Sequence, residues 1–270
     1  MKVETAEEAI KDASYLNTLK ELLYQLADDD FIISFRGAEW LGLAPHIEED
    51  VAYSSITQNT MGHAFLYYQL LEELGEGKVD ELAHERVASD RKNATYFEKK
   101  NGEGDYLHEP HFDWALTVVR QFLYEASKKV KLESLMDSSY LPLGDIAQKI
   151  LMEQNYHLAH WKIWIRQLLE ANQIAIEKIQ FRLDEAWHYQ NEIIGLGPMA
   201  DNMEKYGLIE NEQTLEDRWL EEVKKSVGDF KKGRSVNRGA NGREGNHTND
   251  LTQALNTLAE VYNTDRKAVW

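Results

Sequence analysis

The sequence has 270 residues, of which 43% are hydrophobic and none is cysteine. This length suits one or two domains with a sizeable core, and the lack of cysteine excludes disulfides, thiolate metal sites and cysteine nucleophiles. The formal net charge of −17 disfavours nonspecific binding to nucleic acid or anionic membranes, because phosphates require a basic surface. No apolar run is long enough to span a bilayer, and the N-terminal segment lacks the apolar core of a secretion signal, so we expect a cytoplasmic protein.

Few prolines and abundant Leu, Ala, Glu and Gln indicate an all-α protein. Apolar residues recur at helical spacing in a series of segments separated by glycine and proline. The expected helices are 5–43, bent near Gly37, then 47–74, 111–136, 142–169 and 174–194, with shorter ones near 198–206, 214–227 and 251–262. We expect a single domain over 1–270, with a core bundle over about 5–170 and a C-terminal helical extension over about 171–270.

Two connections stand out between these helices. Residues 78–109 are polar and weakly periodic, which predicts a short helix and an exposed crossover that ends where Pro110 begins the third long helix. Residues 230–250 are rich in glycine, asparagine and arginine and should form a loop. A long crossover between two helix hairpins is typical of one class of four-helix bundle.

The helix over 142–169 has a wide apolar face, interrupted at its middle by two polar residues, Gln154 and His157. These residues are three apart and so lie on one face of the helix. An unpaired polar group in a core costs roughly 1–3 kcal/mol. The pair therefore requires a partner, which could be a metal, a ligand or other side chains.

Polar residues on the other three long helices lie at matching heights. We count residues outward from the hairpin turns at Pro45 and Pro142, with a rise of about 1.5 Å per residue. On antiparallel neighbouring helices, these polar residues then lie at similar heights near the middle of the bundle. The resulting set is Asp30 on the first helix, Thr60 and His63 on the second, Glu125 on the third, and Gln154 and His157 on the fourth.

This arrangement resembles the ferritin-like di-iron bundle, in which two single carboxylates and two Glu-x-x-His pairs hold two metals. Here Thr60 and Gln154 stand where the two glutamates would be, and Glu153 is turned about 100° away from the site. Two ferrous ions carry four positive charges, and the remaining two carboxylates cannot neutralise them in a low-dielectric core. We therefore predict no metal ligands, catalytic residues or cofactor-binding residues in this chain, and expect His63 and His157 to be core histidines hydrogen-bonded to Asp30 and Glu125.

Several short motifs indicate a narrower resemblance. They are Phe35-Arg-Gly-Ala-Glu-Trp-x-Gly-x-Ala-Pro, Met61-Gly-His-Ala, Arg120-Gln-Phe, Asn155-Tyr-His-Leu and Gly245-Asn-His-Thr, followed by a short helix and Trp270. Their order and spacing resemble the C subunits of the bacterial phenylacetyl-CoA 1,2-epoxidases, over nearly the whole chain. In that family the di-iron centre belongs to a separate catalytic protein, the A subunit, and a reductase passes electrons from NADPH.

The resemblance implies a non-catalytic structural subunit of a monooxygenase complex in aerobic phenylacetate catabolism. It implies a hetero-oligomer with the catalytic di-iron subunit, or a homodimer when the chain is alone, and no cofactor held by this chain. Two alternatives remain open. The chain could be a metal-dependent oxidase or oxygenase in its own right, using Asp30, His63, Glu125 and His157 around one metal or an altered pair. It could also be a helical scaffold outside phenylacetate metabolism.

Three further features have both a functional and a simple interpretation. The basic residues Lys231, Lys232, Arg234, Arg238 and Arg243 could meet the phosphates of coenzyme A or an acidic subunit face, but a flexible solvated loop is the favoured interpretation. His157 and His160 have a spacing compatible with metal binding, for which we favour packing. The tryptophans Trp40, Trp114, Trp161 and Trp164 fit a buried aromatic core, whereas aromatic residues beyond the core could serve a subunit interface.

Overall fold

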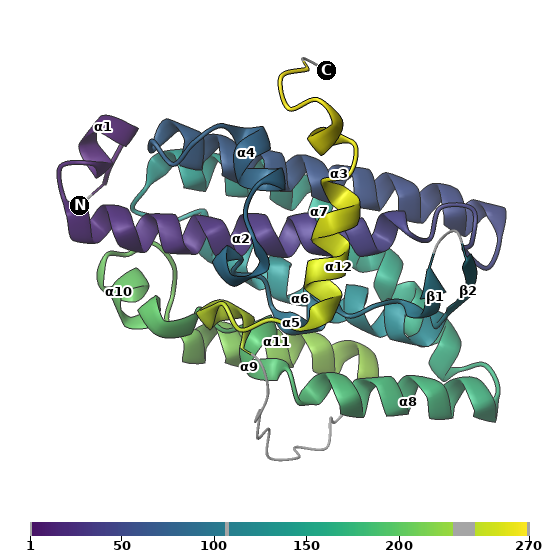
Figure 1. Cartoon of the computed structure of the whole chain (residues 1–270). Helices are drawn as coiled ribbons and strands as arrows, with labels where there is room; N and C mark the ends of the chain where they lie inside the picture. Colours follow the sequence, from purple (N-terminus) through teal and green to yellow (C-terminus); the bar gives the residue numbers. More distant parts are fainter. Residues whose placement is uncertain (1, 106–107, 229–240, 269–270) are drawn as a thin grey trace.

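The computed structural model describes residues 2–105, 108–228 and 241–268. Four long helices form an antiparallel bundle (Figure 1). They are α2 (Ala13–Ala38), α3 (Ile47–Glu73), α6 (Trp114–Leu135) and α7 (Leu141–Leu169). Helix α2 packs mainly on α3, and α6 on α7, so the two expected hairpins are present. None of the described helices is long and apolar enough to cross a membrane.

The four predicted bundle helices are confirmed, with changes at their ends, whereas the helix expected over 174–194 is interrupted at 188–189. The first is divided, because Asp12 caps the start of α2 and separates it from the short helix α1 (Ala6–Ala9). Pro110 does not begin the third helix. It lies in a strand, and Asp113 instead caps α6 by accepting a hydrogen bond from the Leu116 amide.

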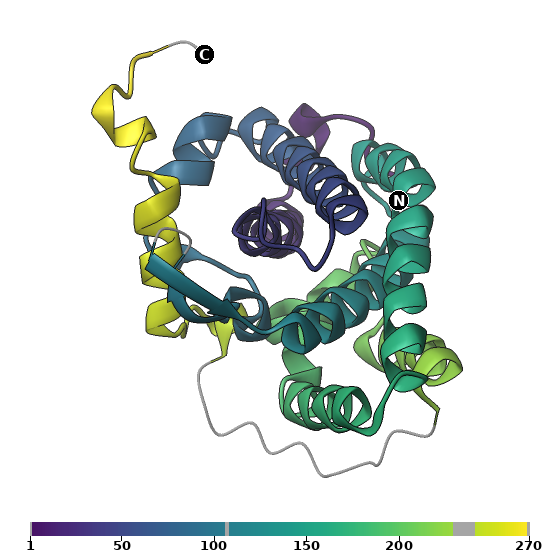
Figure 2. The same ribbon diagram turned by 90° about the vertical axis from the view of Figure 1, so that its right-hand side faces the viewer.

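The C-terminal part adds further short helices to the bundle. They are α8 (Gln173–Trp187), α9 (Gln190–Ile193), α10 (Ala200–Lys205), α11 (Glu212–Val227) and α12 (Asn249–Leu258), with 3-10 turns at Gly197–Met199, Gly242–Glu244 and Tyr262–Thr264. Helices α8 and α11 pack against α6 and α7. Helix α12 crosses the opposite side of the bundle, beside α2 and the crossover (Figure 2).

The crossover between α3 and α6 differs from the expected exposed connection. It contains α4 (Val79–His84), a 3-10 turn (Ala88–Asp90), α5 (Thr95–Glu98) and a two-stranded antiparallel sheet of β1 (Gly102–Asp105) and β2 (His108–Phe112). The strands are largely exposed, but nearly all of residues 91–98 are buried. Helical periodicity missed this segment because much of it is extended and its buried polar groups bond to distant residues.

Helix α2 lies at the centre of the molecule, enclosed by the other elements (Figure 2). Three successive residues near its middle, Asp28, Asp29 and Asp30, are all buried. Since successive helical residues point about 100° apart, these carboxylates face three different parts of the chain. Each therefore requires its own cation, because an isolated charge in a core is very costly.

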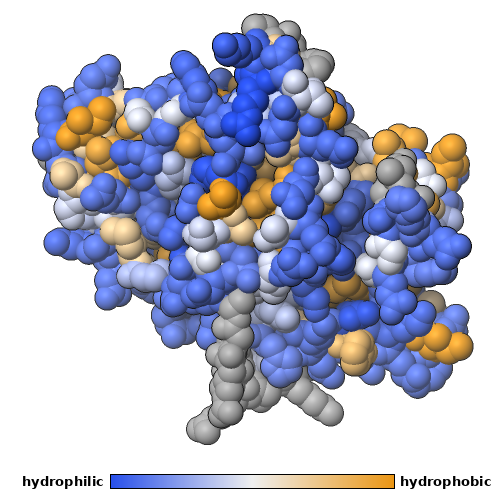
Figure 3. All heavy atoms as spheres, viewed as in Figure 1, coloured by the Kyte–Doolittle hydropathy of each residue, from blue (hydrophilic) through white to orange (hydrophobic). Residues whose placement is uncertain are grey.

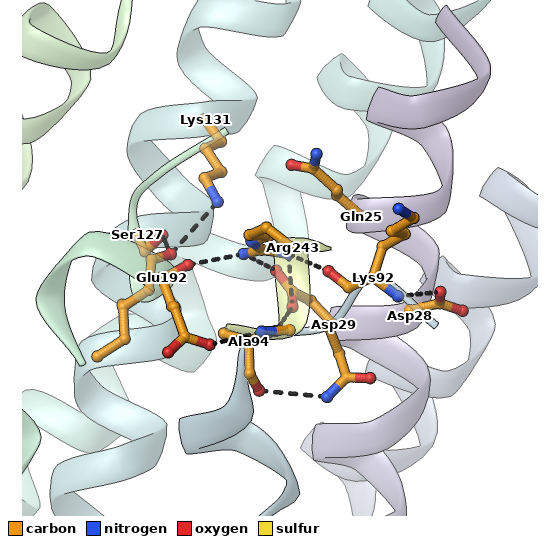
Figure 4. A network of polar contacts seen from close by, with 12 residues as sticks. Gln25, Asp28, Asp29, Lys92, Ala94, Ser127, Lys131, Glu192 and Arg243 are labelled. Carbon is orange, nitrogen blue, oxygen red and sulfur yellow. Dashed lines mark hydrogen bonds and ion pairs between the residues drawn. The ribbon is translucent and has the colours of Figure 1, made fainter. Parts of the chain in front are cut away.

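Asp28 is paired with arginines from the crossover, and Asp29 with an arginine from the C-terminal segment. Figure 4 shows the pair of Asp29 and Arg243. Arg86 and Arg91 donate to Asp28 at 2.8 Å and 3.1 Å. Burial alone would raise the pKa of Asp28, but these two arginines outweigh it and hold the pKa at about 2. Arg243 forms a bidentate pair with Asp29, with N–O distances of 3.0 Å and 2.7 Å.

The position of Arg243 corrects the prediction for the basic segment. Arg243 is 1% exposed, so it neither lies in a solvated loop nor is free to meet coenzyme A. Farther along, His247 and Thr248 both bond to the buried Glu98, which anchors the start of α12. The other basic residues of the segment, Lys231, Lys232, Arg234 and Arg238, lie outside the described residues, as does Trp270.

The Asp29–Arg243 pair should be a major contributor to stability. We expect Arg243→Met to lower the free energy of unfolding by about 3–5 kcal/mol, because it leaves Asp29 buried without its cation. The matched control is Arg266→Met, which removes an arginine paired with Glu85 at the surface and should cost no more than about 1 kcal/mol. Urea unfolding followed by circular dichroism measures both, and equal effects would contradict the assignment.

Candidate functional site

The six polar residues expected at mid-bundle are all buried. Asp30 comes from α2, Thr60 and His63 from α3, Glu125 from α6, and Gln154 and His157 from α7. The ring centroids of His63 and His157 are 6.1 Å apart, and the amide of Gln154 donates to the Glu125 carboxylate at 3.2 Å. Sequence spacing therefore placed the site correctly, although it did not identify the partners of each residue.

A lysine missed by the sequence reasoning lies inside this site. The ammonium of Lys128 on α6 donates to Asp30 Oδ2 at 2.6 Å and lies 3.0 Å from His63 Nδ1. Its side chain is only 6% exposed. The signal was present in the sequence, since Lys128 follows Glu125 by three residues and so shares its helix face.

Tyr124 completes the surroundings of Lys128. Its hydroxyl donates to Asp30 Oδ1 at 2.5 Å and accepts from the Lys128 ammonium at 3.1 Å. Burial raises the pKa of Asp30 to about 6, against the lowering effect of Lys128, so the carboxylate is ionised at neutral pH. The result is a buried ion pair in which both charges have additional hydrogen bonds.

His63 does not bond to Asp30 as expected. Its Nδ1 faces Lys128 and its Nε2 lies 3.0 Å from Glu153 Oε2, so Glu153 reaches the site that it was expected to miss. The prediction for Glu153 used only the direction in which its Cα–Cβ bond leaves the helix, and it was wrong. The long, half-exposed Glu153 side chain bends back across the seam between α3 and α7. Burial, followed by the nearby Lys128 charge, lowers the pKa of His63 far below its usual range, so the ring is neutral.

The other half of the site has a different character. His157 Nδ1 and Glu125 Oε1 are 3.6 Å apart, and Asn59 lies 3.4 Å from His157 Nε2. Among the described residues neither His157 Nδ1 nor Glu125 Oε1 has a hydrogen-bond partner, and the same holds for Gln154 Oε1. The Thr60 hydroxyl is satisfied by the Ile56 carbonyl of its own helix at 2.9 Å.

The donor set does not fit a pair of iron ions. In the half containing Asp30 and His63, the position between the two potential ligands is taken by the Lys128 ammonium, and a second cation there would be strongly repelled. The other half offers one carboxylate, one imidazole and an amide. Within the described parts of the chain, no group of three or more His, Asp or Glu side chains is arranged to hold a metal ion.

The remaining histidine and tryptophan predictions concern the end of the bundle near α8. His160 does not share a partner with His157 and instead lies 3.1 Å from Glu49 on α3. Trp40 and Trp161 are buried, and Trp114 lies in edge contact with Trp40 and packs beside Trp161 and Trp164. Trp40 and Trp161 thus belong to the core, as predicted, whereas Trp114 and Trp164 are partly buried and pack against it.

Behind Lys128, a cavity of about 20 Å³ is lined by Asp29, Asp30, Tyr124 and Lys131, which leaves room for one water molecule. Lys131 is buried and donates to the Ile193 carbonyl at 3.3 Å (Figure 4). Burial, reinforced by Arg243, lowers the pKa of Lys131 to about 7. Compared with the unfolded chain, the folded chain therefore favours the neutral form of this amine.

Two comparisons with known proteins place the chain in a class. The sequence profile of the family described as "Phenylacetic acid catabolic protein" matches residues 1–270, so the chain belongs to that family. The predicted ferritin-like, all-α fold class agrees with this family and with the four-helix bundle. One relative is the C subunit of the 1,2-phenylacetyl-CoA epoxidase of Escherichia coli strain K12. The two chains are 27% identical over 209 residues, which cover 77% of this chain and 80% of that protein.

The lowered pKa of Lys131 predicts a dependence of stability on pH. Between about pH 7 and the unfolded value near 10.4, the unfolded chain binds more protons than the folded one, so stability rises with pH. Relative to Lys131→Met, the wild-type free energy of unfolding should increase by about 1.4 kcal/mol per pH unit over this window. Urea titrations at several pH values measure it.

The control for this experiment is Lys129→Met on the same helix, whose ammonium pairs with Glu222 near the surface. It should retain the wild-type pH slope. Parallel stability curves for the wild type and Lys131→Met would show that Lys131 is protonated in the folded chain.

Proposed function

We propose that this chain is a non-catalytic structural subunit of a phenylacetyl-CoA 1,2-epoxidase complex, and that it pairs with the catalytic di-iron subunit of that complex. The observation that carries the proposal is the Lys128 ammonium between Asp30 and His63. A protonated lysine at this position supplies one fixed positive charge inside a cage of the kind that holds metals in other ferritin-like proteins.

The two neutral side chains Thr60 and Gln154 support the same proposal. A di-iron centre draws on carboxylates at these positions to neutralise its charge, and here Thr60 bonds to its own helix while Gln154 bonds to Glu125. Membership of the family and the similarity to the C subunit of an epoxidase support the assignment to phenylacetate catabolism. The partner is inferred from that similarity.

Metal loading separates a structural from a catalytic role. After anaerobic incubation with excess ferrous iron and desalting, plasma mass spectrometry should find well under one iron per wild-type chain, because Lys128 competes for the cage. The catalytic di-iron subunit, treated in parallel, is the positive control. One or two tightly held irons per chain would favour the competing hypothesis of an oxidase using Asp30, His63, Glu125 and His157.

Reconstitution tests the role in the complex. Together with the catalytic di-iron subunit, this chain should support epoxidation of phenylacetyl-CoA, and His157→Gln in this chain should leave the rate within about twofold of wild type. If His157 were a catalytic metal ligand, its loss should cost about 10–100-fold or more, as even outer-shell changes do at metal sites. Failure of the wild-type chain to associate with the catalytic partner would contradict the pairing.

A further inference from the structure

One face of the bundle is built unlike the rest of the surface. Residues 51–71 of α3 contain no Asp, Glu, Lys or Arg, although 29% of the chain is charged. Every third or fourth residue of this stretch is exposed, so that the exposed residues form one stripe along the helix. The stripe consists of Val51, Ser55, Gln58, Gly62, Phe65 and Gln69.

A second exposed stripe runs along α7 beside the first. It consists of Met152, Asn155, Tyr156, Ala159 and Ile163. Met152 and Tyr156 are 74% and 72% exposed, which is unusual for large apolar side chains. The neighbouring Lys162 is paired with Glu222, whereas Glu153 accepts a hydrogen bond from the neutral His63 and keeps one negative charge at the seam between the stripes. We call the two stripes together the α3/α7 face.

Gly62 is at the centre of this face. It has no left-handed backbone and lies inside a 27-residue helix, where glycine is destabilising relative to alanine. A Cβ atom added to Gly62 would meet nothing within 4 Å among the described atoms, so the packing of the chain itself does not require a glycine. Because contacts within the chain do not explain a glycine at this position, we interpret it as a residue that lets the backbone of another helix approach closely.

The register of the two helices places their exposed residues together. His63 contacts Glu153, and Asn59 contacts His157, so α3 and α7 are antiparallel with Gly62 level with Met152 and Tyr156. A helix lying over Gly62 would therefore touch both large side chains. By contrast, the side that carries α12 is mainly hydrophilic, with only small and scattered apolar areas (Figure 3).

The size of the α3/α7 face suits the core of an interface. The stripe on α3 is about 27 Å long and the stripe on α7 about 17 Å long, and each helix is about 10 Å wide. The resulting area of about 400 Å² is half of the roughly 800 Å² that each partner buries in a complex of standard size, and the exposed charges of Lys149 and Arg166 flank the α7 stripe as a polar rim would. Depletion of charge together with exposed Met, Tyr and Phe is the composition of an interface core.

We propose that the α3/α7 face docks a non-identical protein, through a largely apolar helix face of that protein that approaches closely at Gly62. A second copy of this chain fits less well, because two chains with net charges of −17 would repel each other. This inference rests on the proposed function for the identity of the partner, the catalytic di-iron subunit, and adds where that partner binds.

Four variants test the face through the dissociation constant of the complex with the catalytic partner. Gly62→Arg and Tyr156→Glu should each weaken binding by about thirtyfold or more, because they place bulk or charge in the core of the interface. Gly62→Ala adds one methyl group and should have a much smaller effect than Gly62→Arg. Phe181→Glu, on the comparably exposed outer side of α8, should change binding by less than about threefold.

These substitutions should not weaken binding by unfolding the chain. Arginine and alanine are better helix formers than glycine and meet open space at Gly62, so thermal unfolding of both variants should occur at or above the wild-type temperature. Tyr156 is mostly solvent-exposed and its replacement should leave unfolding nearly unchanged.

Each outcome is informative. If the wild type binds and the Gly62→Arg and Tyr156→Glu variants bind equally well, the face is wrong while the proposed function stands. If the wild type does not bind the catalytic partner, both fail. Sedimentation of the chain alone provides the third outcome: a wild-type homodimer that Gly62→Arg dissociates would show that the occupant is a second copy and would overturn the proposal.

Discussion

The fold depends on three consecutive buried carboxylates. Asp28, Asp29 and Asp30 occupy the middle of the central helix, and each is paired with a cation from a different part of the chain. Figure 4 shows the second of these pairs, between Asp29 and Arg243. Their cations come from the crossover, from the C-terminal segment and from α6 respectively. If one of these segments detached from the bundle, it would leave a buried aspartate without its cation, which costs several kcal/mol. Polar groups, rather than apolar packing alone, thus determine where the long irregular segments lie.

The third of these pairs explains the chemistry of the site. In a di-iron bundle the central charge is supplied by metals and the surrounding carboxylates balance it. Here Lys128 supplies one charge and Asp30 balances it, while Tyr124 and the neutral His63 satisfy the remaining hydrogen bonds. The neutral side chains at Thr60 and Gln154 are consistent with that reduced positive charge. The differences from a di-iron bundle therefore belong together: two ligand carboxylates are absent, and one internal cation takes the place of the metal charge that they would balance.

Helical periodicity was enough to predict the four bundle helices and the convergence of Asp30, His63, Glu125 and His157, because burial follows directly from spacing along a regular helix. It could not assign partners, since Lys128, Arg91 and Arg243 are polar residues whose burial depends on carboxylates distant in the sequence. The same limit explains why the buried part of the crossover was predicted to be exposed. Three adjacent aspartates inside an apolar helix were the available signal that several distant cations had to be buried.

An internal ammonium has a structural advantage over a metal where the site serves only to hold helices together. The stabilisation from a bound metal depends on its free concentration, and it disappears when metal is scarce. Lys128 is covalently attached, so the positions of α2, α3 and α6 around it do not vary with iron supply. His63 connects this ion pair to Glu153 at the seam of α3 and α7, directly beneath the stripes that contain Gly62 and Tyr156. The buried cation therefore supports the geometry of the surface on which the proposed partner would dock.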